Sequence, residues 1–181
     1  MAKRDKTNIT LGSGKIYLTP YTNTVPDVAT LCVEDNLLGY IKGGASLEYT
    51  EETYEETDDL GFVKKVITTS EEAILKCGLL TWNGSTLKSL IDRCTVTEAA
   101  GKRTVKIGGA GNKQDTNYAI CFHHEDKTDG DLWILIIGRN TAGATLSFAK
   151  DAGSVIEPEF KALPQDEDGT LVQLIEETST N

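Results

Sequence analysis

Two apolar segments joined by a short polar link constrain the fold of this chain more than any other feature of its sequence. Residues 117–125 and 131–138 carry apolar side chains at odd and even positions alike, and both have the length of a strand. The link at 126–130 reads Asp-Lys-Thr-Asp-Gly, and Asp-Gly between two apolar runs is typical of a β-hairpin. Because a strand that is apolar on both faces is covered on both faces, we expect this hairpin at the centre of a β-sheet protein.

Much of the remaining chain alternates apolar and polar residues, which is the two-residue period of a strand with one face in water. The segment 45–53 begins in this way, and in 143–149 the alternation directs Phe148 toward the core. Pro158 predicts that 154–163 lies at a sheet edge, because proline lacks the N–H that a central strand needs. Besides the hairpin, the expected strands comprise residues 15–19, 45–53, 62–69, 73–79, 103–107, 143–149, 154–163 and 171–176.

One segment predicts a helix. Ser85 is a good N-cap, and Leu87, Leu90, Ile91 and Cys94 follow at the spacing of one apolar helix face. So short a helix is not stable in water by propensity alone, so it must dock on the sheet. No strand–helix–strand rhythm recurs, which favours antiparallel sheets. The predicted fold is therefore mainly β: an antiparallel β-sandwich or partly closed barrel with one short flanking α-helix.

The 181 residues are expected to form a single domain. Within it we expect an N-terminal arm at 1–14, an extended loop at 50–61 and a C-terminal tail at 164–181, because these segments are polar or charged. No apolar run approaches the roughly 20 residues that span a bilayer, and the basic N-terminus has no secretory signal behind it, so we expect no membrane partner. The cysteines are widely spaced and are expected as buried free thiols: Cys32, Cys77, Cys94 and Cys121.

Residues suited to catalysis or metal binding are few. His123 and His124 are the only histidines, and as neighbours in an expected strand they point to opposite faces. Cys121 lies two residues from His123, and the acidic side chains of 125–131 could hold a hard cation, but an inert buried thiol and a polar turn explain both more simply. The glycine-rich segments lack the spacing of a phosphate loop. We expect no catalytic, cofactor or metal site and no enzyme, and keep an enzyme built on Cys121, His123 and this turn as an alternative.

Charge is distributed unevenly along the chain. The net charge of −10 argues against gripping nucleic acid through its phosphates, which needs clustered lysine and arginine. An acidic run between Glu48 and Asp59 fits either a solvated loop, or a loop whose charge is matched by a neighbouring subunit or faces a lumen. The basic N-terminus and acidic C-terminal region fit two solvated ends or a head-to-tail stack equally well. The residues concerned are Glu48, Glu51, Glu52, Glu55, Glu56, Asp58 and Asp59 in the run, and Lys3, Arg4, Lys6, Asp166, Glu167, Asp168, Glu176 and Glu177 toward the ends.

An ordered series of short segments extends over most of the chain. In order they are Leu11–Leu18, Gly39–Ala45 leading into the acidic Tyr49–Glu56, Ala73–Cys94 with Leu79–Asn83 at its middle, Leu146–Lys150, Glu159–Pro164 and Asp168–Leu171. In this order the segments resemble the major tail tube proteins of siphophages, the long-tailed bacteriophages.

The resemblance implies a structural virion protein, a β-sandwich with one flanking helix whose subunits form hexameric rings. The rings stack around a tape-measure protein, meet a tail terminator protein and let DNA pass without specific contacts, after assembly in the host cytoplasm. Joining sheets between subunits also removes exposed strand edges. By the same resemblance Glu48 is a candidate to line the lumen. The candidates for subunit interfaces are Lys3, Arg4, Lys6, Glu51, Glu52, Tyr54, Glu55, Glu56, Asp58, Asp59, Glu176 and Glu177.

Three other interpretations remain open from the sequence. Another ring protein of the tail, such as a terminator, and the tube subunit of a contractile injection system share the expected fold. A β-sandwich module that binds carbohydrate or protein belongs to a different class and predicts an exposed aromatic platform. Trp82 and Trp133 are the only tryptophans, and Trp133 lies in the apolar hairpin, which argues against such a platform.

Overall fold

The computed structural model describes residues 9–178. The described chain is mainly β with few helices, which confirms the predicted fold class. Within it no helix is long and apolar enough to cross a membrane. The elements are β1 (Lys15–Pro20), α1 (Val28–Leu31), β2 (Leu37–Thr57), β3 (Lys64–Leu79), α2 (Gly84–Leu90), β4 (Cys94–Ala99), β5 (Lys102–Ile107), β6 (Tyr118–His124), β7 (Leu132–Asn140), β8 (Glu159–Leu163) and β9 (Val172–Glu176), with 3₁₀ turns at Glu34–Asn36 and Ala110–Asn112.

One large antiparallel sheet curves back on itself. Its strands follow the order β6-β1-β2-β3-β8-β7-β9, and β6 also pairs with β7. That additional pairing closes six strands into a ring of hydrogen-bonded neighbours. On its other edge β7 pairs with β9 over Leu132–Ile136 and with β8 over Ile137–Asn140. The sheet is therefore a small, partly closed barrel, and β4 and β5 form a separate two-stranded sheet.

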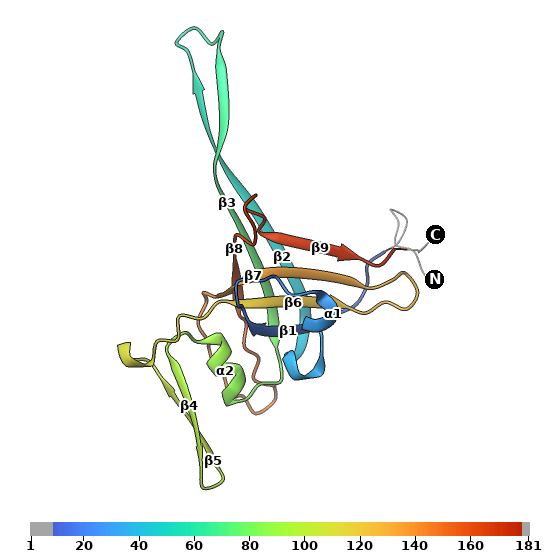
Figure 1. Ribbon diagram of the computed structural model, residues 1–181, viewed down its shortest axis with the longest axis vertical. Coiled ribbons are helices and arrows are strands. Elements are labelled where there is room, and N and C mark those ends of the chain that lie inside the picture. Colours follow the sequence, from blue (N-terminus) through green and yellow to red (C-terminus); the bar gives the residue numbers. More distant parts are fainter. Residues whose placement is uncertain (1–8, 179–181) are drawn as a thin grey trace.

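The β6–β7 hairpin lies at the centre of the fold and is buried on both faces, as its sequence predicts. Ile120 and Ile136 point into the larger core, where side chains of β1, β3, β8 and α2 meet them. Cys121 and Leu135 point to the opposite face and pack with Leu31 of α1. Figure 1 shows α1 lying beside β1 and β6. Successive residues of each strand thus enter two different cores, as strand alternation requires.

Helix α2 forms where the apolar spacing predicts it, but its N-cap is Asn83 rather than Ser85. The Asn83 side chain accepts hydrogen bonds from the backbone N–H groups of Ser85 (2.8 Å) and Thr86 (3.2 Å), and the Thr86 hydroxyl accepts one from the Asn83 N–H (3.2 Å). This reciprocal arrangement is a capping box, and it fixes the start of the helix. The helix ends at Leu90, so the prediction that Cys94 belongs to it is wrong, and Cys94 begins β4 instead.

The predicted extended loop at 50–61 is wrong in its extent, because most of it is strand. β2 continues through it, and β3 joins the predicted strands 62–69 and 73–79 into one. The register shifts next to Glu52, where β3 carries one extra residue. Such a β-bulge locally disrupts the ladder, but β3 continues through it, so the predicted division into two strands is wrong. The turn itself is confined to residues 58–63.

Two further predictions in the C-terminal half are wrong. Residues 143–149 form no strand, and Phe148 is 80% exposed rather than inward. The adjoining strands β7 and β8 pair with each other there, which leaves no edge for another strand. β8 lies between β3 and β7, so it is not an edge strand either. Pro158 directly precedes β8, where its missing N–H interrupts no ladder.

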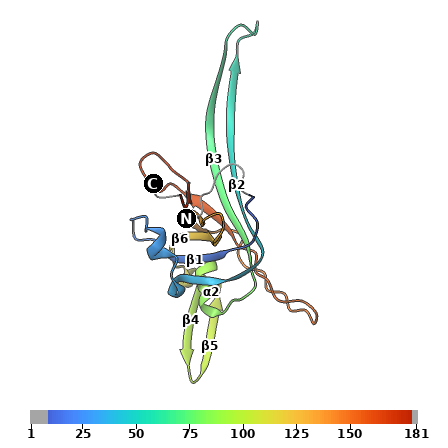
Figure 2. The same cartoon turned by 90° about the vertical axis from the view of Figure 1, so that its right-hand side faces the viewer.

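Two hairpins project from the barrel at opposite ends. Figure 1 shows the long β2–β3 hairpin rising from one end and the β4–β5 hairpin extending from the other. Figure 2 shows the same relationship after a quarter turn, so it does not arise from overlap in one view. Of the smaller hairpin the sequence predicts only β5, because Cys94, which begins β4, falls on the predicted helix and residues 95–99 show no strand pattern.

Candidate functional site

The outer part of the β2–β3 hairpin is the most unusual surface of the molecule. We define the β2–β3 arm as residues 50–71, and every one of them is exposed. Its paired strands extend about 25 Å, at about 3.3 Å per residue over eight residues. The arm carries seven carboxylates and two lysines, so its formal charge is −5. Half of the net charge of the chain thus lies on a thin projecting ribbon.

A like-charge pair marks the base of the arm. Glu51 and Glu71 are directly opposite in the β2–β3 register. The hydroxyl oxygen of Tyr49 lies 2.8 Å from Glu51 Oε1 and 3.1 Å from Glu71 Oε1. Hydrogen bonding to Glu51, loss of hydration and the second bond to Glu71 raise the pKa of the Tyr49 hydroxyl well above its usual value. The hydroxyl therefore stays protonated and can donate its single proton to either of two carboxylates that repel each other.

Lysines neutralise only part of the negative charge. Lys64 Nζ lies 2.7 Å from Glu55 Oε2, and at the base of the hairpin Lys76 Nζ lies 2.7 Å from Glu48 Oε2. Glu48, the lumen candidate, is thus exposed and paired within the chain, and its place in a lumen stays a prediction. Other arm carboxylates form no ion pair with a described lysine or arginine. They are Glu51, Glu52, Glu56, Asp58, Asp59 and Glu71.

The tip of the arm holds three apolar side chains in water. Leu60, Phe62 and Val63 are 76%, 84% and 68% exposed. The Asp58 carboxylate organises this turn, because it accepts hydrogen bonds from the N–H groups of Val63 (2.6 Å) and Leu60 (3.2 Å). Those bonds, the Val63 bond foremost, lower the pKa of Asp58. Asp58, predicted as an interface residue, thus has a role within its own turn.

The remaining interface candidates are placed separately. Tyr54 is half-exposed on the arm, and its hydroxyl donates to Glu56. Glu176 ends β9, and the next residue, Glu177, is tied to the β6–β7 turn. The Glu177 N–H donates to the Asp131 carbonyl (2.9 Å), and its carboxylate accepts from the Asp131 N–H (3.2 Å). Lys3, Arg4 and Lys6 lie outside the described residues, so a contact between the two charged ends stays a prediction.

The residues of the alternative enzyme site contact different groups in the structure. Cys121 is fully buried, and its contact with Cys32 together with burial raises the pKa of its thiol. His123 Nε2 lies 2.8 Å from Asp131 Oδ2, whereas His124 Nδ1 lies 2.7 Å from the carbonyl oxygen of Ser13. The histidines therefore have separate partners, as neighbouring strand positions require. The cysteines are all free, and no group of three His, Cys, Asp or Glu side chains among residues 9–178 could hold a metal ion.

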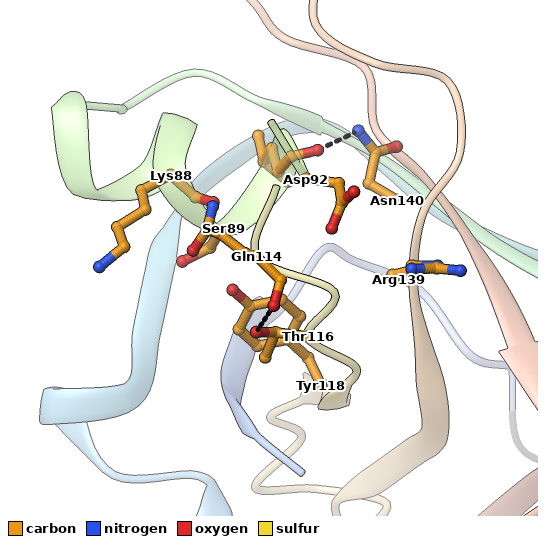
Figure 3. Close-up of a pocket in the computed structure, with 9 residues that line it drawn as sticks. Lys88, Ser89, Asp92, Gln114, Thr116, Tyr118, Arg139 and Asn140 are labelled. Atoms are coloured by element: carbon orange, nitrogen blue, oxygen red, sulfur yellow. Dashed lines mark hydrogen bonds between the residues drawn. The ribbon is translucent and has the colours of Figure 1, made fainter. Parts of the chain in front are cut away.

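A small, partly open space at the end of α2 is a packing junction. Figure 3 shows Gln114, Asn140 and neighbouring side chains around it, and its volume is about 10 Å³, room for about one water molecule. Asn140 donates to the carbonyl of Leu90 (2.9 Å), and Gln114 donates to the carbonyls of Lys88 (3.0 Å) and Ile91 (3.2 Å). Carbonyls at a helix C-terminus lack partners within the helix. These side chains therefore end α2 and fasten it to the barrel.

Sequence reasoning identified the acidic residues of the arm but missed its apolar tip. A signal was present, because three of the four residues 60–63 are apolar within a segment whose flanks are strongly charged. It also missed the basic residues of β5, a strand of the opposite projecting hairpin.

Neither a search of known protein families nor a search of curated proteins finds a match to this chain.

Proposed function

We propose that this chain is a structural subunit that assembles with copies of itself into stacked hexameric rings, the tail tube of a long-tailed bacteriophage. The tube would enclose a tape-measure protein, meet a terminator protein and later conduct DNA in the virion. The single observation that carries the self-assembly is the β2–β3 arm. Hexameric rings and the phage setting come from the ordered resemblance of the sequence segments.

An isolated two-stranded ribbon has little to hold it in water. Two strands without a third or a covering helix are marginally stable at best, and both outer edges of the ribbon offer unpaired N–H and C=O groups. The arm also exposes Tyr54 opposite Ile67, besides its apolar tip. Exposed apolar groups within a charged rim are typical of a protein contact. A second subunit that covers the arm would satisfy its edges and bury these side chains.

The architecture also supports the proposal. A partly closed antiparallel barrel with α2 docked on it is the kind of fold that the resemblance implies. The arm continues into the barrel through the remaining residues of β2 and β3. In β3, buried and half-buried residues alternate from Ala73 to Leu79. A rigid base beneath an exposed ribbon allows the ribbon to reach a neighbour without loss of the fold.

The test is removal of the arm at a register-matched position. Glu52 and Ser70 are paired directly, so replacing residues 53–69 by Asn-Gly leaves a hairpin closed by a two-residue turn. The shortened chain should keep its far-ultraviolet circular dichroism per residue and its cooperative unfolding. In negative-stain microscopy at high concentration the parent should form rings or tubes, and the shortened chain should not. Tubes of normal appearance from the shortened chain, or a parent that stays monomeric across salt and concentration, would overturn the proposal.

A point substitution tests the tip with a matched control. Phe62 and Phe148 have nearly the same exposed fraction, 84% and 80%, but lie on the arm and beside the barrel respectively. Phe62→Ser should raise the concentration at which tubes appear, because aromatic side chains often anchor protein interfaces. Phe148→Ser should leave that concentration unchanged. Equal effects of the two substitutions would show general surface stickiness instead of an arm contact.

A further inference from the structure

The β4–β5 hairpin is the second projecting ribbon, and it lies at the end of the molecule opposite to the β2–β3 arm (Figures 1 and 2). Its strands pair only with each other within the described chain. Val105 packs against the main core, and Cys94 is buried at the base. Beyond this base, residues 97–104 are exposed. The smaller hairpin therefore also presents strand edges and one uncovered face.

This hairpin is basic, in contrast to the acidic chain around it. Residues 94–107 contain two lysines, one arginine and one glutamate, so their formal charge is +2. Arg103 pairs with Glu98 across the ladder, with Nη2 and Oε1 2.5 Å apart. Lys102 and Lys106 are exposed and form no ion pair with another described residue. Two cations on this hairpin thus have no ion-pair partner among residues 9–178.

The two lysines share one face and have a defined spacing. Lys102 and Lys106 are four residues apart on β5, so they lie on the same side of the strand and about 13 Å apart at about 3.3 Å per residue. Thr104 lies between them on that face. The one side chain between the two ammonium groups on this face of β5 is thus small and polar.

Two arm carboxylates repeat this spacing with the opposite charge. Glu52 and Glu56 are four residues apart on β2, with Tyr54 between them, and neither forms an ion pair with a described residue. Glu52 accepts a hydrogen bond from Ser70 (2.9 Å), and Glu56 lies opposite Lys65 in the register. Both ribbons therefore present a pair of like charges at about 13 Å, with opposite signs on the two ribbons.

We propose that the Lys102–Lys106 face of one copy lies against the Glu52–Glu56 face of the next copy. The inference rests on the self-assembly proposed above and names the two surfaces that meet. The hairpins extend from opposite ends of one molecule (Figure 1), so they can meet only between copies. Contacts between two different surfaces repeat from head to tail and build a stack or a ring. Complementary charges fix the register of such a contact and speed its formation.

The first experiment reverses the basic face. Lys102→Glu combined with Lys106→Glu should raise the concentration needed for assembly by about tenfold or more, because two attractive contacts become repulsive. Lys127→Glu combined with Lys150→Glu is the matched control, since both of these lysines are exposed elsewhere and the net charge changes equally. Sedimentation velocity in about 50 mM salt, where exposed charges are weakly screened, measures assembly. Circular dichroism checks folding, and the neutral Lys102→Gln, Lys106→Gln chain serves if the reversed chain unfolds.

The second experiment restores the contact by mixing. A chain that carries Glu52→Lys and Glu56→Lys should also fail to assemble alone, because both of its hairpins are then basic at the contact. Mixed with the Lys102→Glu, Lys106→Glu chain, it should form particles that contain both chains, because each junction again joins opposite charges. In a mixture with the Lys127→Glu, Lys150→Glu chain, the two chains should not alternate along the assembly. The β4–β5 hairpin of that chain is still basic and repels the basic arm.

The outcomes separate this inference from the proposed function. Assembly of the parent, failure of each reversed chain and recovery in the mixture would support the contact. Normal assembly of the Lys102→Glu, Lys106→Glu chain, or failure of the mixture to recover, would overturn it while self-assembly stands. A parent that remains monomeric under all conditions would overturn self-assembly and this contact together.

Discussion

Glu51 and Glu71 face each other directly across the β2–β3 ladder, and their carboxylates approach the same Tyr49 hydroxyl. A hydroxyl has one proton to donate, so it satisfies one carboxylate while the other remains a repelling neighbour. Like charges directly opposite in an antiparallel pair destabilise it. The base of the arm is therefore weakened within the isolated subunit, in agreement with a segment that gains its full stability in an assembly.

Neutralising one member of this pair should make the arm more stable. Glu71→Gln should increase the hydrogen-exchange protection of arm amides about two- to fivefold, as expected for removing a cross-strand repulsion. Glu72→Gln is the control at the next position, because Glu72 instead pairs with Lys161. It changes the charge equally but should lower protection or leave it unchanged. Equal responses of the two chains would mean that the Glu51–Glu71 repulsion is negligible.

Helix α2 offers a test of its N-cap. Asn83→Ala should lower the free energy of unfolding by about 1 kcal/mol, since the N–H groups of Ser85 and Thr86 lose their acceptor. Ser85→Ala should change it by less than about 0.5 kcal/mol, the usual range for exposed positions. Urea unfolding followed by circular dichroism measures both. A larger loss from Ser85→Ala would restore the N-cap that the sequence alone suggested.

The sequence predicts those parts of the fold in which local pattern and burial agree. The β6–β7 hairpin was identified because apolar residues at every position leave no wet face. Prediction from sequence pattern fails where pairing with distant strands determines the structure. Residues 143–149 alternate like a strand, yet no sheet edge is available to them. The sequence predicts Ser85 as the N-cap, whereas the structure has Asn83 there, because Thr86 completes the capping box with Asn83.

The candidate site divides in the same way. Charge clustering in the sequence locates the arm, but the turn role of Asp58 and the tie between Glu177 and Asp131 depend on hydrogen bonds that no spacing reveals. The sequence pattern also does not predict how segments far apart in the chain lie relative to one another. That an acidic and a basic ribbon lie at opposite ends of one barrel follows from the closure of the sheet, which requires three-dimensional pairing.

The core should show a large difference between Phe160 and Phe148, the residue that alternation directs toward the core. Phe160 on β8 is fully buried in the main core, whereas Phe148 is largely exposed. Phe160→Ala should cost about 3–5 kcal/mol through lost burial and a cavity, and Phe148→Ala less than about 0.5 kcal/mol. Thermal and urea unfolding of both chains would measure this. A cost above about 2 kcal/mol for Phe148→Ala would show that residues 143–149 pack as originally expected.

Asp131 should make the stability of the protein depend on pH in the acidic range. Partial burial opposes its charge, but the N–H of Asp126 (2.9 Å) and the His123 ring (2.8 Å) outweigh this and lower the pKa of its carboxyl. A group whose pKa is lower in the folded state stabilises the fold above its unfolded value, about 3.9 for aspartate. That stabilisation is lost as the pH falls through the folded value. The free energy of unfolding, measured with urea from pH 6 to about pH 2, should therefore fall less steeply below about pH 4 in Asp131→Asn than in the parent. Parallel curves would assign the acid sensitivity to other carboxylates, because only the difference between the two chains isolates Asp131.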